Sequence, residues 1–64
     1  MKDYYYIRIW SHDDLDYRAW WSQFDAICST PDLIKIYDNE CEAIAAMHHI
    51  NETHPGLVAV VKRF

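Results

Sequence analysis

Residues 4–10, Tyr-Tyr-Tyr-Ile-Arg-Ile-Trp, decide the fold of this chain. The run combines aromatic and β-branched residues around one arginine, a composition typical of a strand. Side chains alternate across a strand, so one face receives Tyr5, Ile7 and Ile9. The opposite face receives Tyr4, Tyr6, Arg8 and Trp10. We expect the first face to pack under helices and the second face to stay open.

The segment that follows has the apolar spacing of a helix, which either Ser11 or Asp13 can cap. Aspartates crowd its start, where the helix dipole favours negative charge. Apolar residues then recur three and four positions apart, at Tyr17, Trp20, Trp21, Phe24, Ile27 and Cys28. Pro31 disfavours helical geometry at the residue before it, so the predicted helix ends near Ser29.

The second half of the chain predicts a strand, a helix and a strand. Residues 33–37 form the second strand, with Ile34 and Ile36 facing inward and Lys35 and Tyr37 facing outward. A capping-box pattern at Asn39 and Glu42 then begins a helix. The residues that this helix is expected to bury are Ala43, Ile44, Met47 and Ile50. The turn at residues 54–56 ends it.

Residues 57–61 are apolar on both faces, which favours a central third strand. The element order is therefore β-α-β-α-β. We predict a single small two-layer α+β domain over residues 1–64, with a three-stranded sheet and two helices on one face. The residues that we expect to pack between the sheet and the helices are Tyr5, Ile7, Ile9, Ile34, Ile36, Val58 and Val60. A parallel sheet with one helix on each face is the alternative, but a chain of 64 residues barely suffices to cover both faces.

Composition excludes several classes of protein. The net charge of −4 disfavours a reader of duplex DNA, which binds mainly by neutralising phosphates. The apolar runs are much shorter than the roughly 20 residues that cross a bilayer. Met1-Lys2-Asp3 leads directly into the tyrosines, without the pattern of a secretory signal. Two cysteines are too few for a disulfide framework, so we expect a cytoplasmic protein.

No catalytic pattern stands out. The cluster of His48, His49, Glu52 and His54 does not have the spacing of zinc enzymes, although a site that adds Cys41 is conceivable. Cys41 lies in the first turn of a predicted helix and is the candidate for a free reactive thiol. One glycine cannot build a glycine-rich phosphate loop. We expect no enzyme, no metal and no cofactor.

The unusual surface is the outward face of the sheet. The binding residues expected on it are Tyr4, Tyr6, Arg8, Trp10, Lys35 and Tyr37, beside Ala59, Val61 and Arg63. An aromatic and cationic surface of this kind suits three uses. It can pair with a second copy in a homodimer, dock another protein, or stack nucleotide bases.

These observations predict a non-enzymatic binding module that acts by stoichiometric protein–protein interaction. Small acidic viral proteins that inhibit host machinery act in this way. We expect a homodimer and a protein partner. The alternative function is the binding or sequestering of a small ligand or nucleotide at a site between subunits, with Arg8 on phosphate.

Overall fold

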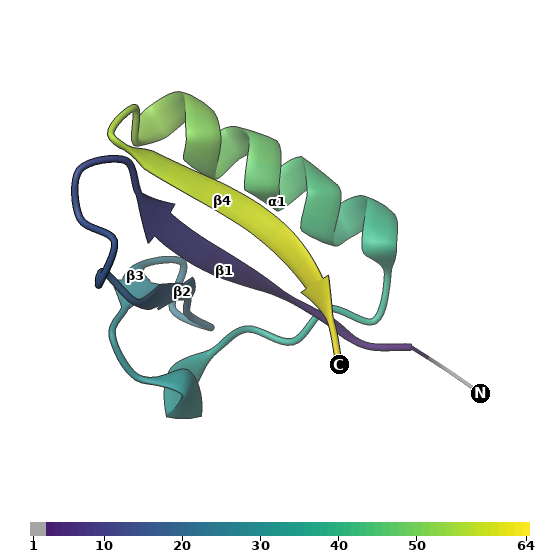
Figure 1. Ribbon diagram of the computed structural model, residues 1–64. Helices are drawn as coiled ribbons and strands as arrows, with labels where there is room; N and C mark the ends of the chain where they lie inside the picture. Colours follow the sequence, from purple (N-terminus) through teal and green to yellow (C-terminus); the bar gives the residue numbers. More distant parts are fainter. Residues whose placement is uncertain (1–2) are drawn as a thin grey trace.

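The computed structural model describes residues 3–64 and shows one four-stranded sheet with one long helix on it (Figure 1). The elements are β1 (Tyr5–Ser11), β2 (Ala19–Trp21), β3 (Ile27–Cys28), a 3-10 helix (Pro31–Leu33), α1 (Glu40–Thr53) and β4 (Leu57–Arg63). The strands pair antiparallel in the order β3-β2-β1-β4. The α+β class is confirmed, but the predicted three strands and two helices are wrong in number.

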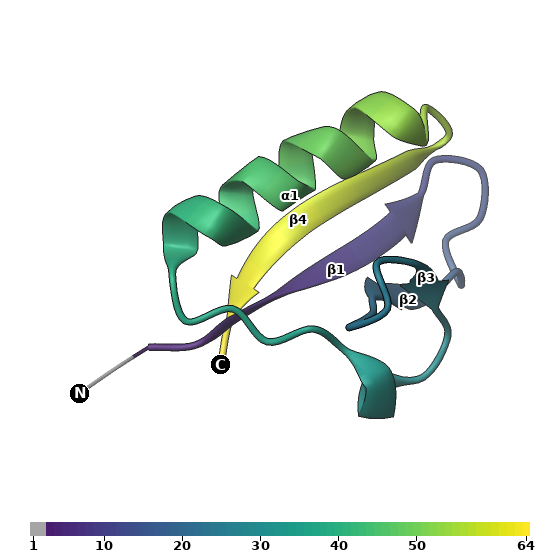
Figure 2. The ribbon, with the colours of Figure 1, turned by 180° about the vertical axis from the view of Figure 1, so that it is seen from behind.

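The helix α1 lies along β4 and β1 on one face of the sheet, and Figure 2 shows the same pair from behind. It begins at Asn39, whose side-chain oxygen accepts a hydrogen bond from the Cys41 N–H at 2.8 Å. Its inward stripe is Ala43, Ala46, Met47 and Ile50. Ile44, which the sequence analysis expected to be buried, is 36% exposed, and Ala46 packs against the core instead.

The predicted helix over residues 13–29 is wrong, because this segment forms a loop and the β2–β3 hairpin. A tight turn closes the hairpin: the Ser22 N–H bonds to the Ala26 carbonyl at 2.8 Å, and Asp25 adopts a left-handed φ of 56°. Trp20 and Trp21 then lie on opposite faces of the sheet. A helix would have placed both indoles on one stripe, whereas the hairpin lets each face of the sheet receive one.

The predicted strand over residues 33–37 is replaced by an extended segment that joins the sheet only at isolated bridges. Ser22 pairs with Ile34, and Tyr5 pairs with Tyr37 through two backbone hydrogen bonds of 2.8 Å. Because Tyr37 lies opposite Tyr5, it turns toward the helix and is buried. The predicted orientation of this segment is therefore inverted: Lys35 and Tyr37 face the helix side, while Ile36 is 58% exposed.

The strand β4 is longer than predicted and lies at an edge of the sheet, not at its centre. Its orientation is also inverted relative to the prediction. Ala59 pairs with Ile9 and packs under α1, so Val58 and Val60 face the other way. The side chain of Asn51 covers part of this edge: it accepts from the Ala59 N–H at 2.7 Å and donates to the Ala59 carbonyl at 3.3 Å.

The hydrophobic core lies between α1 and the sheet. Its buried members are Ile7, Ile9, Ala19, Trp21, Tyr37, Ala43, Ile50 and Ala59. All of the strand residues in this set share the helix side of the sheet. The opposite face carries no helix or strand of the described chain (Figures 1 and 2).

Candidate functional site

The face of the sheet away from α1 is the candidate site, and we call it the open face. Its register is fixed by the strand pairs Tyr6–Lys62, Arg8–Val60, Trp10–Val58, Arg8–Trp20 and Trp20–Cys28. One row therefore crosses all four strands, from Val60 through Arg8 and Trp20 to Cys28. In an antiparallel sheet with one face exposed to water, that face usually carries polar residues, whereas most of these side chains are apolar.

Arg8 occupies the centre of the open face and is held there by its neighbours. Its guanidinium carbon lies 4.4 Å from the ring centroid of Trp10 and 4.6 Å from that of Trp20. The Nη1 donates a hydrogen bond to the Ala19 carbonyl at 2.9 Å. Only 7% of the residue is exposed. Arg8 therefore fills the surface between two indoles rather than projecting from it.

Exposed rings gather at the end of the open face near the C-terminus. Tyr4 is 46% exposed and Phe64 is 64% exposed, and the Phe64 N–H bonds to the Tyr4 carbonyl at 3.0 Å. The Tyr6 and Phe64 rings lie 4.7 Å apart. Together with Ile36, Tyr4 and Phe64 line an apolar hollow of about 230 Å³. Lys62 lies opposite Tyr6 on the open face, two residues before Phe64.

The predicted site residues separate into two groups. The structure brings Tyr4, Tyr6, Arg8 and Trp10 together on the open face, as the alternation along β1 indicated. Lys35 and Tyr37 lie on the helix side of the sheet, in a different groove. Ala59, Val61 and Arg63 were also expected on the open face, but their register places them on the helix side with Ile9, Ile7 and Tyr5. Their predicted placement is wrong.

Other open-face residues were missed by the sequence analysis. They are Trp20, Cys28, Val58, Val60, Lys62 and Phe64. Val58 and Val60 are indistinguishable from their neighbours in a run that is apolar on both faces. The cations at the end of this strand do not decide the matter either, because the adjacent Lys62 and Arg63 lie on opposite faces of the sheet.

Charge is distributed unevenly over the molecule. The strands contain Arg8, Lys62 and Arg63 but no carboxylate. The loop between β1 and β2 carries Asp13, Asp14 and Asp16 around Leu15, which is 94% exposed. The Asp16 N–H bonds to the Asp14 carboxylate at 2.9 Å, so the loop has a turn of its own. An acidic, apolar-tipped loop therefore lies at one end of β1, and Lys62 and Phe64 lie at the other (Figure 1).

The histidines and cysteines do not assemble a recognisable centre. Over residues 3–64, no group of three or more histidine, cysteine or acidic side chains has the geometry to hold a metal ion. Cys41 is an exposed free thiol, and Cys28 is a half-buried free thiol that donates to the Thr30 carbonyl at 3.3 Å. Within the same residues, the helices are too short or too polar to span a membrane.

Comparison with known proteins adds no relative: no family model, no curated protein and no solved structure matches the chain.

Proposed function

We propose that the chain is a non-enzymatic protein-binding module that acts by stoichiometric contact, and that the open face is its contact surface. The observation that carries this proposal is the uncovered apolar face with Arg8 at its centre and exposed rings of Trp10, Tyr4 and Phe64 around it. Tyrosine, tryptophan and arginine dominate the energetics of protein interfaces. Large apolar patches on small monomers are characteristic of interaction sites.

The occupant that this surface fits best is a second copy of the chain. A twofold axis between two facing sheets, running across the strands, places the Leu15 end of one copy over the Phe64 end of the other. Leu15 would then meet the hollow of Tyr4, Ile36 and Phe64, and the acids beside Leu15 would meet Lys62. The same contact forms twice, because the interface of a twofold dimer is self-complementary.

The blocked edge of the sheet also favours contact through the face. Asn51 already occupies both backbone groups of Ala59, so a strand from a second copy cannot pair along the middle of β4. The nucleotide alternative has less support, because Arg8 donates to Ala19 and is stacked between two indoles rather than presented to a phosphate.

Multi-angle light scattering at high micromolar concentration tests the proposal on the wild type and two exposed-residue variants. We expect a wild-type dimer, and we expect Phe64→Ala and Leu15→Ala to weaken it by about tenfold or more each, because each removes two buried apolar contacts per dimer. Both residues are largely exposed in the single chain, so the fold should survive, as circular dichroism would verify.

The matched control is Phe24→Ala, which removes a ring that is 71% exposed in the turn between β2 and β3 and outside the proposed contact. A wild type that stays monomeric, or a dimer that Phe24→Ala weakens as much as Phe64→Ala does, would overturn the proposal.

A further inference from the structure

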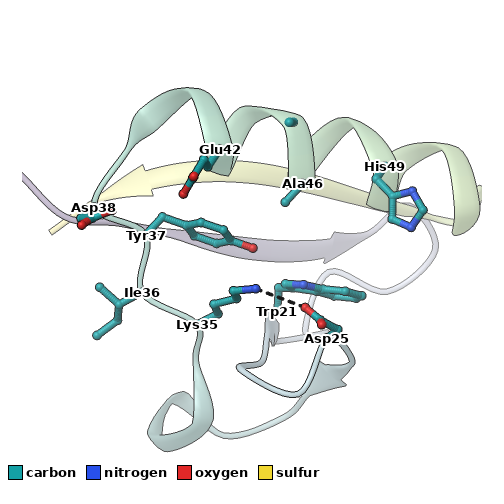
Figure 3. A pocket seen from close by; sticks show the side chains of 10 residues that line it. Trp21, Asp25, Lys35, Ile36, Tyr37, Asp38, Glu42, Ala46 and His49 are labelled. Atoms are coloured by element: carbon teal, nitrogen blue, oxygen red, sulfur yellow. Dashed lines mark hydrogen bonds and ion pairs between the residues drawn. The ribbon is translucent and has the colours of Figure 1, made fainter.

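A groove of about 800 Å³ lies on the helix side of the sheet, between α1 and the extended segment at residues 35–38 (Figure 3). Glu42 and His49 reach it from α1, Lys35 and Tyr37 from the segment, and Trp21 from the end of β2. Its volume is within the range of small-ligand sites. The open face lies on the other side of the sheet, so this groove stays accessible in the proposed dimer.

The walls of the groove are two buried aromatic side chains. Trp21 is 9% exposed and Tyr37 is 7% exposed. The backbone of Tyr37 is fixed by its two hydrogen bonds to Tyr5, so its ring has a defined place. The Tyr37 hydroxyl makes no hydrogen bond to any other residue of the described chain, and in Figure 3 it points into the groove. No buried side-chain oxygen of the described residues lacks a hydrogen-bond partner, so this hydroxyl is accessible to solvent, and a ligand's polar group can take the place of water there.

Among the described residues, the charged side chains that line the groove are Asp25, Asp38, Glu42 and Lys35. Lys35 is paired with Asp25, so the carboxylate on which the inference rests is that of Glu42. Burial raises the pKa of the Tyr37 hydroxyl, with Asp25 and Glu42 adding to the effect and Lys35 opposing it. The phenol is therefore neutral at physiological pH, and its hydroxyl oxygen remains able to accept a hydrogen bond.

The chain already places one ammonium in this environment. The Lys35 Nζ lies 3.3 Å from the Asp25 carboxylate and 5.4 Å from the centroid of the Tyr37 ring. The Lys35 and Asp25 side chains are 38% and 72% exposed, so water competes for this pair. The groove is thus compatible with an ammonium group between a carboxylate and an aromatic face. The Lys35 side chain, which provides this group here, is held only weakly.

We infer that this groove binds an alkylammonium group, from a free aliphatic amine or from a lysine side chain of a peptide. The ammonium would donate to the Tyr37 hydroxyl and the Glu42 carboxylate, and its methylene chain would lie on the Trp21 and Tyr37 rings. The Lys35 ammonium would compete with the ligand's ammonium for the carboxylates of the groove. The inference does not depend on the proposed dimer.

The test is a titration followed by the backbone amide and tryptophan indole signals in NMR spectra, at neutral pH and low salt, where surface charges are least screened. The probes are spermidine and a short lysine peptide blocked at both ends. The neutral control ligand is the same peptide with its lysine acetylated. We expect shifts at Trp21 and Tyr37 with both amines and none with the acetylated peptide.

Three variants test how the ligand is bound, and the two that change a charge report the sign of the ligand's charge. We expect Glu42→Gln to weaken amine binding by about threefold and Lys35→Gln to strengthen it by a similar factor, the size of one exposed charge contact. Tyr37→Phe keeps the ring and removes the hydroxyl, so it should also weaken binding. Glu40→Gln is the matched control, because it removes a carboxylate from the same first turn of α1 but does not line the groove.

Opposite signs would overturn the inference. If Lys35→Gln weakens binding and Glu42→Gln strengthens it, the groove prefers an anion. Absence of shifts at Trp21 and Tyr37 with both amines, or an equal effect of Glu40→Gln and Glu42→Gln, would also contradict it.

Discussion

Two residues, Arg8 and Tyr37, contribute to the two different surfaces of this small sheet, the open face and the groove on the helix side. Arg8 has a strand position that faces away from the helix, yet two tryptophan rings and the Ala19 carbonyl hold its guanidinium. Tyr37 lies on the other side of the sheet and contributes its ring to the core while its hydroxyl reaches a groove. The Arg8 side chain is used entirely for packing, whereas the packing of the Tyr37 ring leaves its hydroxyl available at a surface.

The raised pKa of Tyr37 makes a prediction about alkaline stability. Burial disfavours the phenolate, so the folded protein retains this proton at pH values where an unfolded tyrosine, with a pKa of about 10, loses it. This contribution is fully present below that pH and is lost as pH rises through the folded pKa. We expect urea unfolding to show that Tyr37→Phe loses less stability than the wild type between neutral and alkaline pH.

Tyr4→Phe is the control for this measurement, because it removes the hydroxyl of a tyrosine that is 46% exposed. An alkaline loss of stability in Tyr37→Phe equal to that in the wild type would show that the burial of this phenol does not govern the effect.

At the scale of elements, the parts of the fold predicted from the sequence are those with local signals. The alternation in β1 gives the orientation of Tyr6, Arg8 and Trp10, and the Asn39 cap gives the start of α1. The aromatic spacing in residues 17–28 matches a helix and a hairpin, because adjacent Trp20 and Trp21 fit either. The hairpin forms when β1 offers a partner strand, which is tertiary information.

The orientation of an apolar strand cannot be derived from its own sequence. In β4 both faces read as apolar, and only the pairing of Ala59 with Ile9 decides that Val60 faces outward. The predicted orientation of Lys35 and Tyr37 was wrong for the same reason. Both side chains lie in the groove on the helix side of the sheet and not on the open face. The candidate site was therefore predictable along β1 and not across the neighbouring segments.

The contact between Asn51 and β4 is an element-level device whose removal is informative. Asn51→Ala leaves the Ala59 N–H and carbonyl without their side-chain partner, and we expect a loss of about 1–2 kcal/mol in the free energy of unfolding. The freed edge should also promote association that increases with protein concentration. Urea unfolding and light scattering measure the two effects.

Asn39→Ala is the control for this prediction, since it removes the α1 cap at a cost of about 1 kcal/mol and leaves the β4 edge covered. If Asn39→Ala associates as strongly as Asn51→Ala, general destabilisation rather than the opened edge is the cause.

At the scale of the whole molecule, the fold separates the carboxylates from the apolar open face. The carboxylates occupy loops and the helix, and the strands carry only cations. The acidic loop around Leu15 lies at one end of the sheet, and Lys62 and the apolar hollow lie at the other, so a twofold pair of chains with antiparallel strands would bring unlike charges together twice. This arrangement also leaves the groove at Tyr37 facing outward.

The proposed dimer is tested by a charge exchange between two variants, followed by sedimentation velocity. In the proposed dimer, Lys62→Glu alone places two carboxylates against each other at both contacts, and Asp16→Lys alone places two ammonium groups together. We expect each variant by itself to dissociate, and an equimolar mixture of the two to recover dimers, because both contacts in the mixed pair are then of opposite charge. A mixture that remains monomeric, or single variants that dimerise as well as the wild type, would contradict the proposed dimer.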